Sequence, residues 1–177
     1  MGIDYPEDEN NEQTYFRYLT RLDLVRDYID DKYKTLPDEE LKRNAYVHSY
    51  GVGQAASLLA LFRGFDEETA EMACIAGMFH DFAKYYVEDT DDHAHVSAKI
   101  AESFLKETGD FSEEEIKTIT EGIYHHSDKM VDDNVPFNDI IKDADALQHY
   151  LRNPMEKYWL EKSRVKKTVE ELKLNKH

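Results

Sequence analysis

The sequence lacks the features of an extracellular or membrane-spanning protein. Its 177 residues include a single cysteine, Cys74, which excludes an intrachain disulfide and is typical of a reducing compartment. The longest predominantly apolar runs, such as residues 55–62, are far too short to span a bilayer. The opening residues, MGIDYPEDENNEQ, are acidic and have no apolar core, so no signal peptide is predicted. We therefore expect a cytoplasmic protein with no membrane partner.

Positive charge is also scarce. The chain has 22 Lys and Arg residues against 38 Asp and Glu residues, which gives a formal net charge of −16 at pH 7. The resulting negative field opposes contact with a nucleic-acid backbone, so no nucleic-acid polymer is expected as a partner. A small phosphorylated ligand is still compatible with this charge, because bound metal ions can create a local positive site.

Glycine and proline are few, at 7 and 4 residues, and apolar residues recur at intervals of three and four. This periodicity predicts an all-α protein. Helix start and stop signals include Pro37, Asp66, Gly109 and the Ser112–Glu115 capping box. The predicted helices cover about residues 11–34, 38–63, 66–80, 94–108, 112–126, 138–153 and 155–173, with Asn138 or Asp139 as the cap of the sixth. We expect them to form a single domain over residues 1–177.

Histidine and aspartate carry the chemical information in this sequence. Six of the 8 histidines lie between residues 48 and 126, and several stand at or near predicted helix ends beside aspartates. Along the chain the order is His48, His80-Asp81, His93, His125-His126 and Asp145. Imidazole and carboxylate groups are ligands of iron, manganese, zinc and similar ions. A helical bundle can bring such side chains together from separate helices, with enough ligands for two ions and Asp81 as a bridge.

These residues belong to longer motifs: His48-Ser49, His80-Asp81-Phe82-Ala83-Lys84, His93 with Ser97-Ala98, His125-His126, and Ala144-Asp145. In this order and spacing they resemble the HD-domain superfamily of metal-dependent phosphohydrolases over about residues 40–152. The motifs are most similar to those of bacterial enzymes that cleave diadenosine tetraphosphate symmetrically. The resemblance implies an HD-domain helical bundle of about five core helices, with extra helices at residues 11–34 and 155–173.

The resemblance also implies a set of metal ligands. A first divalent ion would be held by His48, His80, Asp81 and Asp145. Asp81 would bridge to a second ion, held by His93 and His126. Three alternatives stay open: His95 in place of His93, His125 in place of or together with His126, and Asp143 in place of Asp145. Without such a role, His95 and His125 would support a ligand or face solvent. Asn44 stands where some members carry an acid for a third ion, so we expect two ions of Fe, Mn, Co or Ni.

The function implied by the resemblance is hydrolysis of a nucleotide or a related phosphate ester or anhydride by attack of a metal-bound hydroxide. Asp81 would act as the bridging catalytic carboxylate, and Lys84 would neutralise charge that develops on the phosphoryl oxygens. Two alternatives are a di-iron oxygenase of the same fold and a nucleotide-binding regulatory module without turnover. The terminal helices would complete the core or form a homodimer. His149 is predicted to be structural or exposed, and Trp159 to pack in the core.

Overall fold

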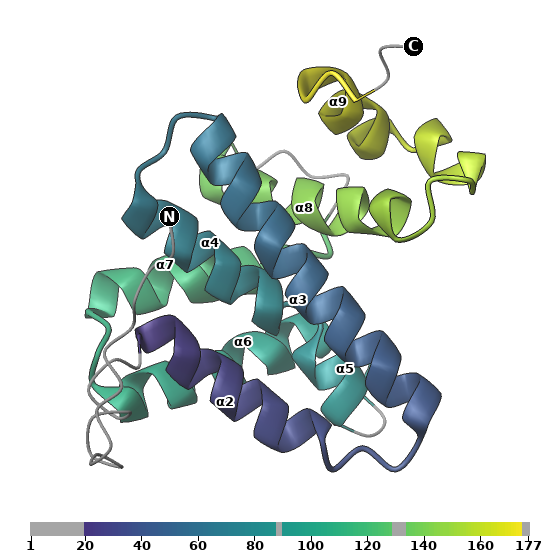
Figure 1. The fold of residues 1–177 in the computed structure, drawn as a ribbon. Coiled ribbons are helices and arrows are strands. Elements are labelled where there is room, and N and C mark those ends of the chain that lie inside the picture. The colour runs from purple at the N-terminus through teal and green to yellow at the C-terminus, as the bar shows by residue number, and fades with distance from the viewer. Residues whose placement is uncertain (1–19, 88–89, 129–133, 175–177) are drawn as a thin grey trace, which may run out of the picture.

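The computed structural model describes residues 20–87, 90–128 and 134–174, and within these ranges every regular element is a helix (Figure 1). The α-helices are α2 (Arg21–Tyr33), α3 (Glu39–Phe62), α4 (Glu67–Phe79), α5 (Phe82–Tyr86), α6 (His93–Thr108), α7 (Glu113–Tyr124), α8 (Pro136–Arg152) and α9 (Ser163–Glu171). A 3-10 helix, η2 (Lys157–Glu161), precedes α9. The predicted all-α class is confirmed, and no helix in the described residues is both long and apolar enough to cross a membrane.

Several predicted helix ends are confirmed by the contacts of their capping residues. The Asp66 side chain accepts a hydrogen bond from the backbone N–H of Thr69 at the start of α4. At the start of α7, Ser112 and Glu115 form the reciprocal capping box that their spacing predicts. Gly109 ends α6 with a φ of 72°, in the left-handed region that favours glycine.

One predicted helix is interrupted, and one predicted helix start is wrong. The first helix does not run unbroken from residue 11 to residue 34, because Thr20 is extended and caps α2 through a reciprocal bond with Asp23. Residues 11–19 lie outside the described residues. Neither Asn138 nor Asp139 caps α8, which begins at Pro136 with Val135 as its N-cap residue. Proline is favoured at the first position of a helix because it lacks a backbone N–H, and an N–H at that position would have no acceptor within the helix.

The predicted C-terminal helix over residues 155–173 is divided. Residues 157–161 form the 3-10 helix η2, and α9 begins only at Ser163. Apolar contacts hold this segment on α8, with Ala146 and Leu147 packed against Val165 and Val169. Arg164 also pairs with Asp143 of α8 at 2.7 Å. The C-terminal segment is therefore fastened to the helix that carries Asp145.

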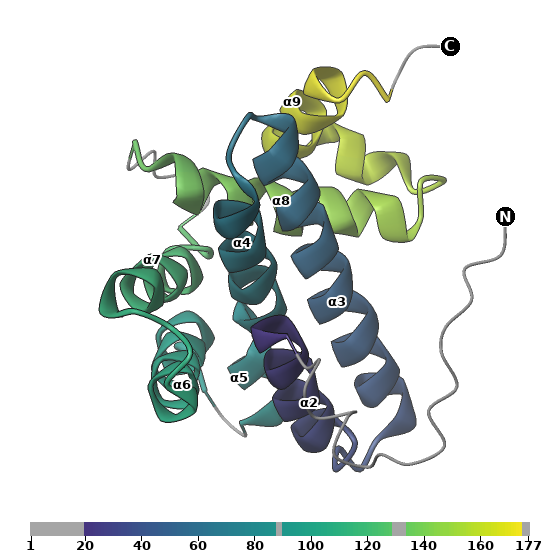
Figure 2. The same cartoon turned by 60° about the vertical axis from the view of Figure 1, so that its left-hand side comes forward.

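The longest helix, α3, runs through the molecule from the end formed by α2 and α5 to the end formed by α8 and α9 (Figures 1 and 2). It packs against α4 at a pair of glycines. A Cβ atom on Gly77 would lie 2.8 Å from the Cα atom of Gly53, and a Cβ atom on Gly53 would lie 2.9 Å from the carbonyl oxygen of Cys74. The close approach of the two backbones therefore requires glycine at both positions. The same close approach places His48 of α3 beside His80 at the end of α4.

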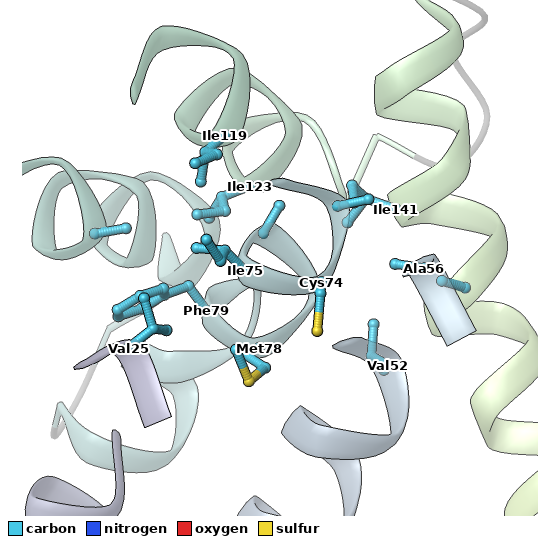
Figure 3. Close-up of a cluster of buried hydrophobic side chains, with 14 of the residues drawn as sticks. Val25, Val52, Ala56, Cys74, Ile75, Met78, Phe79, Ile119, Ile123 and Ile141 are labelled. Carbon is cyan, nitrogen blue, oxygen red and sulfur yellow. The ribbon is translucent and has the colours of Figure 1, made fainter. Parts of the chain in front are cut away.

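The hydrophobic core surrounds α4 (Figure 3). Side chains of α4 meet those of α2, α3 and α7 in one buried cluster that includes Val25, Val52, Ile75, Met78, Phe79, Ile119 and Ile123. All of these side chains are at most 1% exposed. Burying one large apolar side chain stabilises a fold by about 1.5–3 kcal/mol. The core therefore anchors the C-terminal end of α4, and the His80-Asp81 pair follows directly from it.

Candidate metal centre

The His80-Asp81 pair lies in the break between α4 and α5. Asp81 occupies the N-cap position of α5, where aspartate normally bonds to a backbone N–H, but its side chain makes no capping bond. Instead, the Ser97 hydroxyl of α6 accepts a hydrogen bond from the backbone N–H of Ala83, at 2.9 Å. Because Ser97 satisfies this part of the helix start, the Asp81 carboxylate can turn toward the surrounding imidazoles.

A first group of donor atoms gathers on one side of Asp81. The Nε2 atoms of His48 and His80 lie 3.1 Å apart. The same two atoms lie 3.4 and 3.6 Å from Asp81 Oδ2, and 3.4 and 3.7 Å from Asp145 Oδ1. All four side chains are nearly or fully buried. The structure thus brings together the four residues expected to hold a first ion.

A second group gathers on the other oxygen of Asp81. Oδ1 lies 3.2 Å from Nε2 of His93, the first residue of α6, and 3.2 Å from Nε2 of His126, just beyond the end of α7. The two oxygens of Asp81 therefore face two different sets of imidazoles, which is the arrangement expected of a carboxylate that bridges two ions.

Hydrogen bonds at Nδ1 determine which ring nitrogen faces the centre. Nδ1 of His48 donates to the Gln148 side-chain oxygen at 2.8 Å, and Nδ1 of His80 and of His126 donates to the carbonyl oxygens of Gly77 and Ile123 at 2.6 and 2.7 Å. These oxygens can only accept, so each ring carries its hydrogen on Nδ1. In the neutral ring the lone pair of Nε2 therefore points at the carboxylates. Hydrogen bonds of this kind orient metal-binding histidines in known metal sites.

The electrostatics of the first group favour a shared cation. Burial disfavours a charge on His48, but Asp145 and Asp81 outweigh it and raise the pKa of His48 to about 9. Burial lowers the pKa of His80. Burial also favours the neutral acid at Asp81, yet the surrounding imidazoles, His80 foremost, hold its pKa far below the usual range. Asp81 and Asp145 are thus ionised and face the Nε2 atoms of the imidazoles. Within the first group, only the proton on His48 offsets this negative charge.

The donor set fits divalent transition metals. Bonds of about 2.0–2.2 Å from one ion to imidazole nitrogen and carboxylate oxygen place neighbouring donor atoms about 3.0–3.5 Å apart. The distances from His48 to His80 and from the four imidazoles to Asp81 and Asp145 given above, 3.1 to 3.7 Å, are close to this range. The chain therefore has His/Asp groups able to hold a metal, among them His48–His80–Asp81 and Asp81–His93–His126.

Lys84 lies at the solvent side of this cluster. Its Nζ atom donates to Asp81 Oδ2 at 2.7 Å, while half of its side chain remains exposed. The ammonium group therefore lies beside the Asp81 carboxylate and is open to an incoming anion. The sequence predicts a contact of Lys84 with phosphoryl oxygens, and its hydrogen bond to Asp81 is an additional feature of the structure.

Three residues that the sequence left as alternatives lie elsewhere. His95 pairs with Asp92 and stacks on Tyr124, with ring centroids 3.6 Å apart. His125 pairs with Asp128 at 3.1 Å. Asp143 is fully buried, but it faces Arg63 and Arg164, each at 2.7 Å. The structure does not bring these three side chains into the groups of donor atoms around Asp81.

One residue of the cluster was not predicted. Nε2 of His149 lies 3.4 Å from Asp145 Oδ1, and the group His48–Asp145–His149 can also hold a metal. The signal in the sequence is the spacing of four between Asp145 and His149, which places both side chains on one face of α8. His149 is predicted from the sequence to be structural or exposed because it lies beyond the last of the family motifs, which end at Asp145. Trp159, expected in the core, is partly buried against the smaller hydrophobic cluster of Ala146, Leu147, Val165 and Val169, and it also stacks on His149 with 4.5 Å between ring centroids.

A comparison with protein families gives one match. The family described as "HD domain" matches residues 45–150, more than half of the 177 residues, and the matched segment contains every residue of the two donor groups. A search of curated proteins and a search of solved structures each gave no match.

Proposed function

Because the chain belongs to the HD-domain family, whose members are generally metal-dependent hydrolases, we propose that it is a phosphohydrolase with two divalent metal ions. The proposed substrate is a nucleotide or a related phosphate ester or anhydride, with dinucleoside polyphosphates as the first candidates. The proposed ions are Fe, Mn, Co or Ni, which suit mixed imidazole and carboxylate ligands.

The observation that carries the proposal is the position of the Asp81 carboxylate. Its Oδ2 atom faces His48 and His80, and its Oδ1 atom faces His93 and His126, at 3.2 to 3.6 Å. A carboxylate that only stabilises the fold needs one such set of partners. Two separate sets, with Asp145 closing the first, support a pair of ions joined by Asp81.

In this proposal the protein residues position the ions and the substrate, and the ions activate the phosphoryl group and the attacking water. When bound, such ions polarise a phosphoryl group and lower the pKa of water. His48, His80 and His126 keep their hydrogens on Nδ1, so that Nε2 of each ring faces the ions without a change of tautomer, and His48 releases its second proton when an ion binds. Lys84 can leave Asp81 Oδ2, or share its hydrogen bonds, to contact a phosphoryl oxygen as negative charge develops there.

The first test is metal content followed by a screen for hydrolysis. The purified protein is analysed for metals, stripped with a chelator and reloaded with Mn, Fe(II), Co or Ni in the absence of oxygen. Nucleotides, dinucleoside polyphosphates and simple phosphodiesters are then tested for phosphate or nucleotide release, in water enriched in ¹⁸O. We expect metal-dependent release with ¹⁸O in the product, and loss of both bound metal and release in Asp81→Ala.

The same test contains the results that would contradict the proposal. Full metal content in Asp81→Ala would exclude Asp81 as the bridge. Oxygen consumption that depends on an added substrate, without phosphate release under anaerobic conditions, would favour an oxygenase. A nucleotide that binds the metal-loaded protein and stays intact would favour a regulatory module.

A further inference from the structure

We propose that His149 is an additional metal ligand of this centre and that Trp159, from the segment beyond the family match, holds it in position. This inference rests on the proposed function, because it concerns the same ions. It goes beyond the six residues that the family motifs identify, since the motifs end at Asp145.

The first step is the position of His149 relative to Asp145. Residues four apart on a helix lie on the same face, and here Nε2 of His149 is 3.4 Å from Asp145 Oδ1. The same oxygen lies 3.4 and 3.7 Å from Nε2 of His48 and His80. Asp145 Oδ1 is thus surrounded by three imidazole nitrogens, and His149 stands at the same distance as the expected ligand His48.

The second step is the size of the group. The donor atoms of His48, Asp145 and His149 all lie within 4.8 Å of one another. Donor atoms on opposite sides of one ion are about 4.0–4.4 Å apart for bonds of 2.0–2.2 Å, and neighbouring ones are closer. A single ion can therefore contact all three after shifts of a few tenths of an ångström.

The third step is the way in which the His149 ring is oriented. The indole of Trp159 lies parallel to it, with 9° between the planes and 4.5 Å between the centroids. Trp159 belongs to η2, outside residues 45–150. Stacking on one face of the ring directs its edge, which carries the nitrogen atoms, toward Asp145.

The fourth step is the attachment of η2 to the rest of the molecule. α9, which follows η2, is joined to α8 through Arg164, paired with Asp143 and Asp139 at 2.7 and 3.1 Å. It is joined to the end of α3 through Glu171, paired with Arg63 at 2.8 Å. These contacts give the C-terminal segment a fixed position on the helices that carry His48 and Asp145. A ligand held in advance loses less side-chain entropy when the ion binds.

The side chain of His149 is more exposed to solvent than the two imidazoles of the first group. Its side chain is 28% exposed, whereas those of His48 and His80 are at most 3% exposed. His149 therefore lies at the solvent side of Asp145. A histidine that served only to orient Asp145 would leave the number of nitrogen ligands on the ion unchanged.

The test compares two histidine variants without measuring turnover. Wild-type protein, His149→Ala and the control His95→Ala are stripped of metal and titrated with Mn²⁺ by calorimetry. Pulsed EPR of the Mn²⁺-loaded proteins then counts the coordinated imidazole nitrogens. We expect at least a tenfold loss of affinity for one ion and one fewer imidazole in His149→Ala, and no change in His95→Ala, whose side chain stacks on Tyr124 away from the centre. Trp159→Leu should weaken binding less than His149→Ala and keep the imidazole count.

Trp159 also reports on the centre directly, because it is the only tryptophan of the chain. Paramagnetic Mn²⁺ bound by His149 should quench its fluorescence in wild-type protein, with the same midpoint as the calorimetric titration. If His149→Ala does not fold, as judged by circular dichroism, His149→Gln takes its place with the same expected losses. Equal affinity and an equal imidazole count in wild type and the His149 variant would overturn this inference alone. A wild-type protein that binds no metal would overturn the proposed function with it.

Discussion

Asp143 and Asp145 provide a matched pair for separating function from stability. Both are buried on α8, two residues apart, but Asp143 faces two arginines and Asp145 faces histidines. We expect Asp143→Asn to destabilise the protein and keep the metal centre. We expect Asp145→Asn to lose the metal at a smaller cost in the stability of the metal-free protein.

The expected magnitudes follow from the partners. Removing one member of a buried ion pair costs about 3–5 kcal/mol. Arginine cannot release its charge, but Arg63 keeps Glu171 and Arg164 keeps Asp139, so the low end, about 3 kcal/mol, is expected for Asp143→Asn. For a chain of this length, that corresponds to a fall in the melting temperature of about 6–12 °C.

Histidine, unlike arginine, can release its charge when a carboxylate is removed. The carboxylates raise the pKa of His48 to about 9, above its unfolded-state value of about 6.5. The resulting stabilisation is fully present below pH 6.5 and is lost as the pH rises through about 9. A pH of 7.5 is about 1.5 units below the folded-state pKa of His48, so about 2 kcal/mol of this stabilisation remains there. Asp145→Asn should therefore cost no more than about 2 kcal/mol in metal-free protein.

The assay is thermal unfolding with and without saturating Mn²⁺. A ligand at 100 times its dissociation constant stabilises the folded state by about 2.7 kcal/mol. Wild type and Asp143→Asn should both show this gain, and Asp145→Asn should show little of it. The reasoning would be refuted if Asp145→Asn kept the full gain, or if folded Asp143→Asn lost it.

Three further predictions concern the helix crossing, the lysine and the pH. Gly77→Ala should destabilise the protein by about 1–3 kcal/mol in urea unfolding, because the new Cβ meets the backbone of Gly53 at 2.8 Å; unchanged stability would mean that α3 and α4 can separate without cost. Lys84→Ala should retain both metals in elemental analysis and lose about 10²-fold in kcat/KM, since it removes the contact to the phosphoryl oxygens and a hydrogen bond to Asp81 but no metal ligand. Loss of metal would assign Lys84 a structural role instead. Metal affinity should rise by up to about tenfold per pH unit between pH 7 and about 9, because binding displaces the proton of His48. Calorimetry in two buffers of different ionisation heat would detect the released proton, and a pH-independent affinity would contradict this assignment.

The C-terminal segment illustrates how a region outside a family match can act on the site. Residues 157–171 contribute no residue of the HD motifs, and yet they place an indole on His149 and a guanidinium on Asp143. Both contacts are with α8, the helix that carries Asp145. Stabilising this helix and orienting its candidate ligands are therefore two consequences of one packing arrangement.

The sequence by itself determined the helical class, most helix boundaries and the order of the candidate ligands. Helices are predictable because the period of apolar residues and the caps, such as Asp66 and the Ser112–Glu115 box, act over a few neighbouring residues. The start of α8 at Pro136 was not predicted, because several residues there favour a helix start. The division of residues 155–173 was not predicted, because the packing of this segment against α8 decides it.

Only the tertiary structure decided which side chains meet. Asp143 and Asp145 are both buried on α8, and in the sequence only the Ala144-Asp145 motif favours one over the other. A difference of two positions on the helix turns Asp143 toward Arg63 and Arg164 and Asp145 toward His48. The same rotation of the helix brings His149 to the centre, where it pairs with Asp145. Contacts of this kind depend on how helices far apart in the sequence cross, and that crossing is set by long-range packing such as the Gly53–Gly77 approach.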